Sequence, residues 1–134
     1  MSDFRRVTDD FSVAPQITVE DVTMAAELGF TLLINNRPDG EAPDQTVGAE
    51  IEAAARALGL DYLHIPVSGG PRVDQAEAFQ AALVQADGPV LAFCRSGTRS
   101  INTWALGQAL AGCDRGGLIV AGASAGYDLR ALLG

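Results

Sequence analysis

Short apolar runs alternate along the chain with longer segments in which apolar positions have helical spacing. Three largely apolar runs of strand length cover residues 30–34, 62–65 and 89–93. Continuous apolar character is typical of strands that are buried on both faces of a parallel sheet. A shorter run, residues 11–13, predicts an edge strand.

The segments between these runs predict helices. They cover residues 18–28, 46–58, 72–86 and 101–111. The first begins with the capping-box pattern Thr18-Val19-Glu20-Asp21, and glycines end the first two helices at Gly29 and Gly59. After a turn at residues 112–117, the apolar tail at 118–132 is expected to be helical in its last part.

Alternation of strands and helices with short joins predicts an α/β fold with a mainly parallel central sheet flanked by helices. A chain of 134 residues without a linker or a repeat predicts a single domain over residues 1–134. Ligands of such sheets bind beyond the carboxyl ends of the strands. The loops at residues 35–44 and 68–71, together with Cys94, are expected at those ends.

Composition excludes several classes of partner. The net charge is −8 and no basic run occurs, which argues against nucleic acid and against an anionic membrane surface. No stretch is long and apolar enough to span a bilayer, and the N-terminus lacks the apolar core of a signal peptide. We therefore expect a cytoplasmic protein with two free thiols, Cys94 and Cys113.

The strongest chemical signal follows the last apolar run. It reads Cys94-Arg95-Ser96-Gly97-Thr98-Arg99-Ser100 and leads into a predicted helix. Backbone N–H groups of such a loop and the positive end of a helix form a cradle for an anion, which favours a nucleophilic thiolate. Most isolated cysteines are buried structural residues. Two arginines, a glycine and a hydroxyl within six residues favour an active thiolate instead.

Each residue of the loop has an expected role. Cys94 is the nucleophile, Arg99 and Arg95 hold the anionic part of the substrate, and Ser100 holds the thiolate by a hydrogen bond. The amides of residues 95–99, and so Ser96 and Thr98, line the cradle, while Gly97 supplies a backbone angle or clearance that a side chain would forbid.

The loop resembles the signature shared by cysteine-dependent phosphatases and rhodanese sulfurtransferases. Phosphatases have five residues between cysteine and arginine, whereas this chain has four, as in the shorter rhodanese loop. Phe93 stands where the phosphatases have a histidine. Their acidic residue on the loop after the third strand is missing from residues 67–71, and Asp74 is expected in the first turn of the next helix.

The rest of the chain resembles a different family. The matching stretches lie in order between residues 12 and 132, and they include Val13-Ala14-Pro15-Gln16, Ile65-Pro66-Val67 and the closing Ala125-Gly126-Tyr127-Asp128-Leu129. They are similar to the bacterial phosphatase-like domain named after β-lactamase hydrolase-like proteins. This resemblance implies a dual-specificity-phosphatase-like fold. It also implies either sulfur transfer, beside persulfide-oxidising partners, or phosphatase chemistry.

Because the short loop suits a persulfide better than a phosphate, the favoured prediction is a sulfurtransferase. Cys94 would take a sulfane sulfur from thiosulfate or glutathione persulfide and pass it to a thiol or cyanide acceptor, with a persulfide dioxygenase as a candidate partner. Two alternatives stay open. One is a phosphatase that acts through a phosphocysteine, and the other is a non-catalytic module that binds an oxyanion or a partner.

Other residues carry weaker signals. Arg37, Asp39 and Ser68 are candidates for the pocket rim together with Glu41, although a solvated loop explains the first two and Glu41 equally well. Two distant cysteines and one histidine, His64, give no metal-ligand spacing, so neither a metal nor a cofactor is expected. His64 is expected to be a hydrogen-bonded core residue, Cys113 a bystander rather than a resolving thiol, and Trp104 part of a helix packing face.

Overall fold

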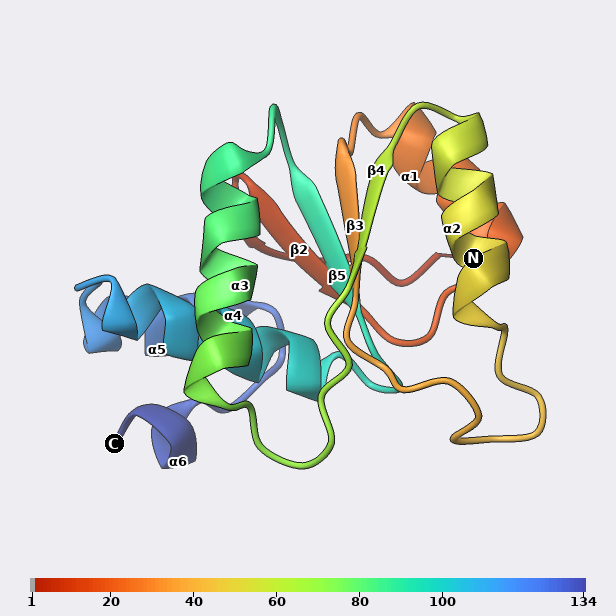
Figure 1. Cartoon of the computed structure of the whole chain (residues 1–134). Coiled ribbons are helices and arrows are strands. Elements are labelled where there is room, and N and C mark those ends of the chain that lie inside the picture. Colours follow the sequence, from red (N-terminus) through yellow and green to blue (C-terminus); the bar gives the residue numbers. More distant parts are fainter. Residues whose placement is uncertain (1) are drawn as a thin grey trace.

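A computed structural model describes residues 2–134 and contains one five-stranded sheet (Figure 1). The strands lie in the order β1-β2-β5-β3-β4. Their bounds are Arg5–Thr8 for β1, Phe11–Ala14 for β2, Leu32–Asn35 for β3, Asp61–His64 for β4 and Val90–Phe93 for β5. Only β1 is antiparallel to its neighbour. The prediction of an α/β fold with a mainly parallel sheet is confirmed.

The parallel strands begin and end level with one another. Phe93, the last residue of β5, is paired with Ala14 of β2 on one side and with Asn35 of β3 on the other. Asn35 is in turn paired with His64 at the end of β4. The segments that follow these four strands therefore leave the sheet at one edge, the lower edge in Figure 1.

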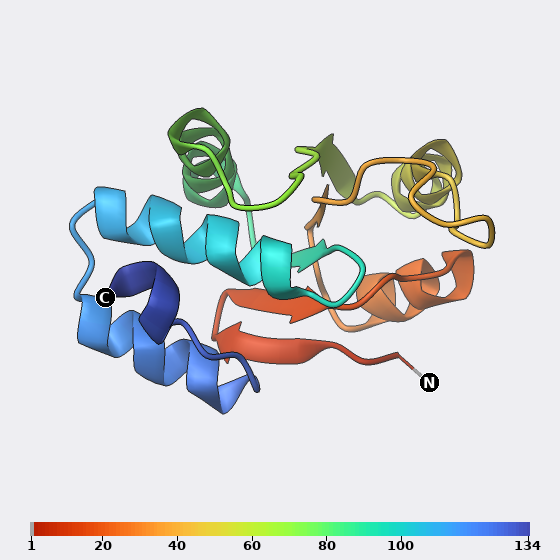
Figure 2. The same cartoon turned by 90° about the horizontal axis from the view of Figure 1, so that it is seen from below.

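In the part of the chain that the structure describes, six helices cover the two faces of the sheet (Figure 2). On one face lie α1 (Val19–Glu27) and α2 (Gly48–Ala57), and on the other lie α3 (Val73–Gln85), α4 (Thr98–Leu110), α5 (Arg115–Ser124) and α6 (Arg130–Leu133). Within residues 2–134, no helix has both the length and the apolar character that crossing a bilayer requires.

Each face of the sheet has its own hydrophobic core. In β5, Val90 and Ala92 face the core under α3 and α4, while Leu91 and Phe93 face the core under α1 and α2. This alternation follows from the period of two in a strand. Trp104 of α4 is buried and stacks on Phe11 with ring centroids 5.2 Å apart, which confirms its predicted packing role.

The position of one strand, the start of one helix and the exposure of one residue differ from the sequence prediction. The strand at residues 11–14 is not an edge strand, because β1 pairs with its outer side. The expected turn at residues 112–117 is shorter, since the Asp114 side chain accepts a hydrogen bond from Gly117 N and starts α5 at Arg115. His64 is exposed rather than buried, although its Nε2 lies 2.9 Å from the carbonyl oxygen of Arg37.

Candidate active site

Cys94 stands directly after β5 and is completely buried. The cysteine loop, residues 94–97, turns the chain from β5 into α4, with Gly97 as the N-cap residue. The backbone N–H of Gly97 points back at the cysteine and donates to Cys94 Sγ at 3.1 Å. The sulfur therefore sits at the amino end of a 13-residue helix, where backbone amides and the helix dipole favour a negative charge.

Gly97 is the one position of the cysteine loop at which a side chain would not fit. Its φ is +91°, which is the left-handed region that favours glycine. A Cβ added there would lie 2.1 Å from the hydroxyl oxygen of Tyr127 and 3.0 Å from its Cζ. Both the backbone angle and the close neighbour therefore require glycine, in line with the predicted need for a backbone angle or clearance at this position.

Replacing Gly97 by alanine tests this packing. Left-handed backbone costs an alanine about 1–2 kcal/mol, and the contact with Tyr127 adds to that cost. Gly112→Ala is a matched control, because Gly112 has a φ of +95° and open space around its Cβ position. Thermal unfolding should show a larger loss for Gly97→Ala than for Gly112→Ala. Equal losses would contradict the close contact with Tyr127.

Arg99, in the first turn of α4, is aimed by two acceptors from other loops. Its Nη1 and Nη2 each donate to one oxygen of Glu41 at 2.8 Å, and Nη1 also donates to the carbonyl oxygen of Val67 at 2.8 Å. These contacts use three of the five N–H donors of a guanidinium. The Nε–H and the second Nη2–H share the remaining edge and donate to no oxygen within residues 2–134, while the guanidinium also interacts with the Cys94 sulfur. That edge is a planar fork suited to two oxygens of an anion.

Glu41 lies on the β3–α2 loop, residues 36–47, and joins two arginines. Besides the two bonds to Arg99, its Oε1 accepts from Arg37 Nε at 2.9 Å. The hydrogen bonds from Arg99 first and Arg37 second lower the pKa of Glu41 to about 2. Glu41 also raises the pKa of Arg99, with a further contribution from Cys94. The carboxylate therefore stays charged at neutral pH and cannot serve there as a proton donor.

The structure corrects the place of Arg37. Its side chain is only 5% exposed, so it is a buried support rather than a rim residue. Arg37 Nη1 donates to Gln16 Oε1 at 3.0 Å, and its backbone N–H donates to Asn35 Oδ1 at 2.9 Å. These bonds fix Arg37 beneath Glu41, which in turn orients Arg99.

A Glu41→Gln variant should weaken the hold on Arg99. A hydrogen bond to a charged group contributes about 1.5–3 kcal/mol, so we expect the oxyanion tungstate to bind about tenfold to hundredfold more weakly in a calorimetric titration. Glu52→Gln is the matched control, since Glu52 pairs with Arg56 on an exposed face of α2. If both variants bound tungstate as tightly as the original protein, Glu41 would have no part in orienting Arg99.

The same contact predicts an acid dependence. Because folding lowers the pKa of Glu41, its contribution to stability is present above the usual glutamate pKa and is lost as pH falls toward about 2. In Glu41→Gln this part of the acid destabilisation should be missing from unfolding curves measured over that range.

Ser100 follows Arg99 in α4 and is completely buried. Its hydroxyl oxygen has no hydrogen-bond partner among the residues that the structure describes. A buried hydroxyl without a partner is costly, and such groups in native proteins call for an explanation. Ser100 stands three residues after the loop that holds the sulfur, and its predicted hydrogen bond to the thiolate stays a prediction.

The remaining candidates lie at the surface. Arg95, Ser96 and Thr98 are exposed, and the hydroxyl of Ser96 donates to that of Thr98 at 3.1 Å. Arg95 accepts a backbone bond from Gln16, and its guanidinium contacts no acceptor within residues 2–134. Their predicted part in substrate binding stays a prediction.

The other two predicted rim residues differ from each other. Asp39 accepts a hydrogen bond from Gly48 N at 2.8 Å and so caps α2, which favours a structural role. Ser68 is exposed and directly follows Val67, whose carbonyl holds Arg99. Its role as a rim residue stays a prediction.

Asp74 lies in the first turn of α3, as predicted. It is exposed and pairs with Arg72, and hydrogen bonding to Arg72 lowers the pKa of Asp74. This favours the charged form and makes Asp74 a poor acid at neutral pH.

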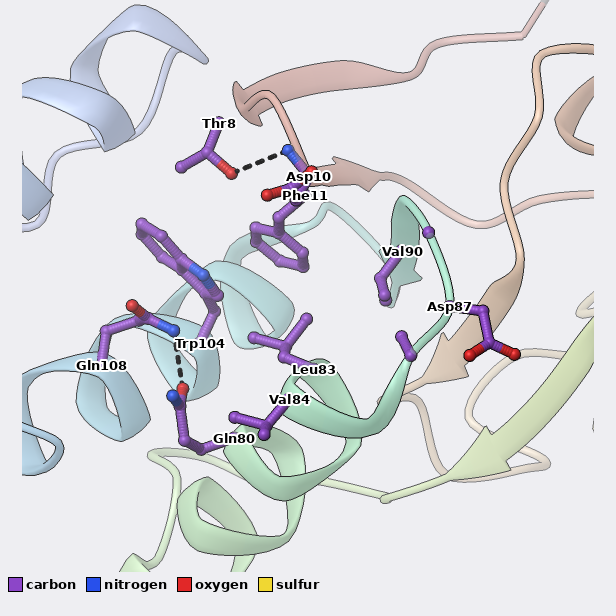
Figure 3. A pocket seen from close by; sticks show the side chains of 12 residues that line it. Thr8, Asp10, Phe11, Gln80, Leu83, Val84, Asp87, Val90, Trp104 and Gln108 are labelled. Carbon is purple, nitrogen blue, oxygen red and sulfur yellow. Dashed lines mark hydrogen bonds between the residues drawn. The ribbon is translucent and has the colours of Figure 1, made fainter.

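A separate cavity lies at the opposite end of the sheet (Figure 3). It has a volume of about 460 Å³ and is lined by residues that include Phe11 and Val90, the first residues of β2 and β5. Gln80 and Gln108 join across it by a hydrogen bond of 2.6 Å. None of the predicted site residues lines this cavity, so it is not part of the cysteine site.

Cys113 is exposed and lies beyond the far end of α4. A helix of 13 residues is about 20 Å long, which is well beyond the reach of a disulfide. Cys113 therefore cannot act as a resolving thiol for Cys94 in this fold, and the prediction of a bystander fits the structure.

The site has the parts of one class of protein, the cysteine-dependent phosphatases: a cysteine at a helix start, a loop amide that donates to its sulfur and an arginine fork that interacts with the sulfur. Residues 3–111 match the family described as the phosphatase-like domain of Beta-lactamase hydrolase-like protein, and the chain belongs to this family. A Beta-lactamase hydrolase-like protein of Agrobacterium fabrum is 40% identical over 129 residues. That match covers 94% of this chain but only 30% of the relative.

Solved structures agree with this assignment. A candidate phosphatase from Neisseria meningitidis has a TM-score of 0.86 and 30% identity, with 99% of this chain and 95% of that chain covered. A candidate phosphatase from Shewanella putrefaciens, at 21% identity and a TM-score of 0.73, shares the fold over 99% of this chain and 87% of its own.

The prediction of a sulfurtransferase is wrong, because the family and these structures point to phosphatases and fit the alternative better. The prediction depended on a loop one residue shorter than that of phosphatases. In the structure the anion site is not formed by the cysteine loop alone. Glu41 and Val67, from two other loops, orient Arg99. Loop length is therefore a weak guide to the group transferred.

Proposed function

We propose that this chain is a cysteine-dependent phosphatase that hydrolyses phosphate monoesters through a phosphocysteine. The observation that carries the proposal is the arrangement around Arg99. Glu41 and Val67 occupy one edge of its guanidinium, and the other edge is left for two phosphate oxygens next to Cys94. Membership of a phosphatase-like family supports the same chemistry.

In the first step the Cys94 thiolate attacks phosphorus. A sulfur–phosphorus bond forms, the ester oxygen–phosphorus bond breaks, and the leaving oxygen takes the electron pair. The Gly97 amide and Arg99 stabilise negative charge at the site. The proton for the leaving oxygen comes from solvent in this scheme, because Glu41 stays ionised and Asp74 pairs with Arg72. Esters of acidic alcohols, such as aryl phosphates, are therefore the favoured substrates.

In the second step water attacks the phosphocysteine. The sulfur–phosphorus bond breaks, inorganic phosphate leaves with the water oxygen, and the electron pair returns to Cys94 as a thiolate. The buried hydroxyl of Ser100 donates to that returning sulfur, which gives this hydroxyl the partner it otherwise lacks within residues 2–134. Stabilising the leaving thiolate lowers the barrier of this step.

Release of inorganic phosphate from p-nitrophenyl phosphate tests the proposal. We expect turnover that vanadate inhibits competitively, and a phosphoryl adduct on Cys94 in acid-quenched samples analysed by peptide mass. Stoichiometric binding of tungstate without any turnover of aryl, alkyl or acyl phosphates would overturn the proposal and identify an oxyanion-binding module.

A further inference from the structure

A single peptide unit connects Tyr127 to the reactive sulfur. The N–H of the Ser96–Gly97 peptide donates to Cys94 Sγ at 3.1 Å, and the carbonyl oxygen of the same peptide accepts from the Tyr127 hydroxyl at 2.8 Å. We propose that Tyr127 is a positioning residue that fixes this peptide plane so that its N–H faces the sulfur. Tyr127 lies between α5 and α6, outside the family match at residues 3–111.

The direction of the Tyr127 hydroxyl is itself fixed. Arg5 of β1 donates from Nη1 to the Tyr127 oxygen at 3.0 Å, so the tyrosine proton is left to point at Ser96. The guanidinium carbon of Arg5 also lies 5.3 Å from the centre of the tyrosine ring, and Asp3 holds Arg5 at 2.9 Å. Burial raises the pKa of Tyr127, so it keeps its proton at neutral pH.

Packing leaves the peptide little room to turn. The Tyr127 oxygen is so close to Gly97 that a Cβ there would overlap it. A rotation of the plane by half a turn would aim the Ser96 carbonyl, rather than an N–H, at a negatively charged sulfur. The tyrosine bond opposes that rotation, and a hydrogen-bonded carbonyl also strengthens the N–H at the other end of its peptide.

Other charged groups act on the same sulfur. Arg99 of α4 interacts with it directly, Glu41 acts through Arg99, and Arg5 acts through Tyr127. Removal of the Tyr127 hydroxyl should therefore make the thiolate form of Cys94 less stable but should not prevent it from forming. The proposal concerns the ionisation of Cys94 and does not depend on which group the thiolate attacks.

The test is alkylation of Cys94 by iodoacetamide across a pH range, in a Cys113→Ser background so that one thiol remains. In Tyr127→Phe we expect the midpoint of the pH–rate curve to rise and the rate at neutral pH to fall about threefold to tenfold, the equivalent of one hydrogen bond. Tyr62→Phe is the matched control, because the Tyr62 hydroxyl accepts only from Asn35 in the other core layer.

Arg5→Met is a second variant, which should move the midpoint in the same direction by less, since it leaves the tyrosine hydroxyl in place. An unchanged midpoint in Tyr127→Phe, with or without a lower melting temperature, would overturn the proposal and assign Tyr127 a purely structural role. Equal shifts in Tyr127→Phe and Tyr62→Phe would overturn it too. Alkylation needs no substrate, so these outcomes are separate from any failure of phosphatase turnover.

Discussion

Cys94→Ser should lose at least about four orders of magnitude in kcat for aryl phosphates while it still binds tungstate, as losses on removing a covalent nucleophile indicate. The serine oxygen fits the buried position and can accept from Gly97 N, so the cradle survives. Its hydroxyl stays protonated at neutral pH and is a poor nucleophile. Steady-state kinetics and calorimetric titration with tungstate measure the two properties.

Cys113→Ser is the control for this prediction. Cys113 is exposed beyond the far end of α4 and should be replaceable with full activity. Turnover by Cys94→Ser at more than about a hundredth of the original rate would show that another group is the nucleophile, given the usual size of such losses.

Arg99→Lys should lose about two to four orders of magnitude in kcat/KM, with both kcat and KM affected. Lysine keeps the charge but has no planar fork. It cannot bond both oxygens of Glu41 and the Val67 carbonyl while still presenting two donors to a phosphate. Kinetics with p-nitrophenyl phosphate measure the loss.

Arg56→Lys is the matched control, because Arg56 forms a partly exposed pair with Glu52 on α2 and should tolerate the change. If Arg99→Lys lost no more activity than Arg56→Lys, the planar guanidinium of Arg99 would not be needed for catalysis.

Much of the fold was predictable because the buried strands are continuous apolar runs and the helix ends carry local signals. The capping box at Thr18 and Asp21 forms as its spacing indicates. β1 was missed, since Arg5-Arg6-Val7-Thr8 presents only one buried apolar side chain, Val7. Its pairing with β2 is a tertiary property that the local sequence does not show.

In the candidate site, too, the residues close together in the sequence were predictable and those brought in by tertiary contacts were not. Residues 94–100 are contiguous, so their arrangement followed from a strand, a short loop and a helix start. Glu41 was considered only as a rim residue and Tyr127 was given no role. Both act through contacts with residues far away along the chain, at Arg99 and Ser96. Within the cysteine loop, the feature that reflects the presence of Tyr127 is Gly97, because its lack of a side chain leaves room for the tyrosine oxygen.

The level ends of the parallel strands have a consequence for how such proteins diversify. The site lies at the carboxyl ends of β2, β5, β3 and β4, whose register is fixed by their pairing. The loops that follow these strands are not part of the sheet's hydrogen bonding. A residue can therefore be gained or lost between Cys94 and Arg99 without shifting the sheet register. Insertions or deletions of single residues can therefore be accommodated in the cysteine loop, while the core sequence stays under the same packing constraints.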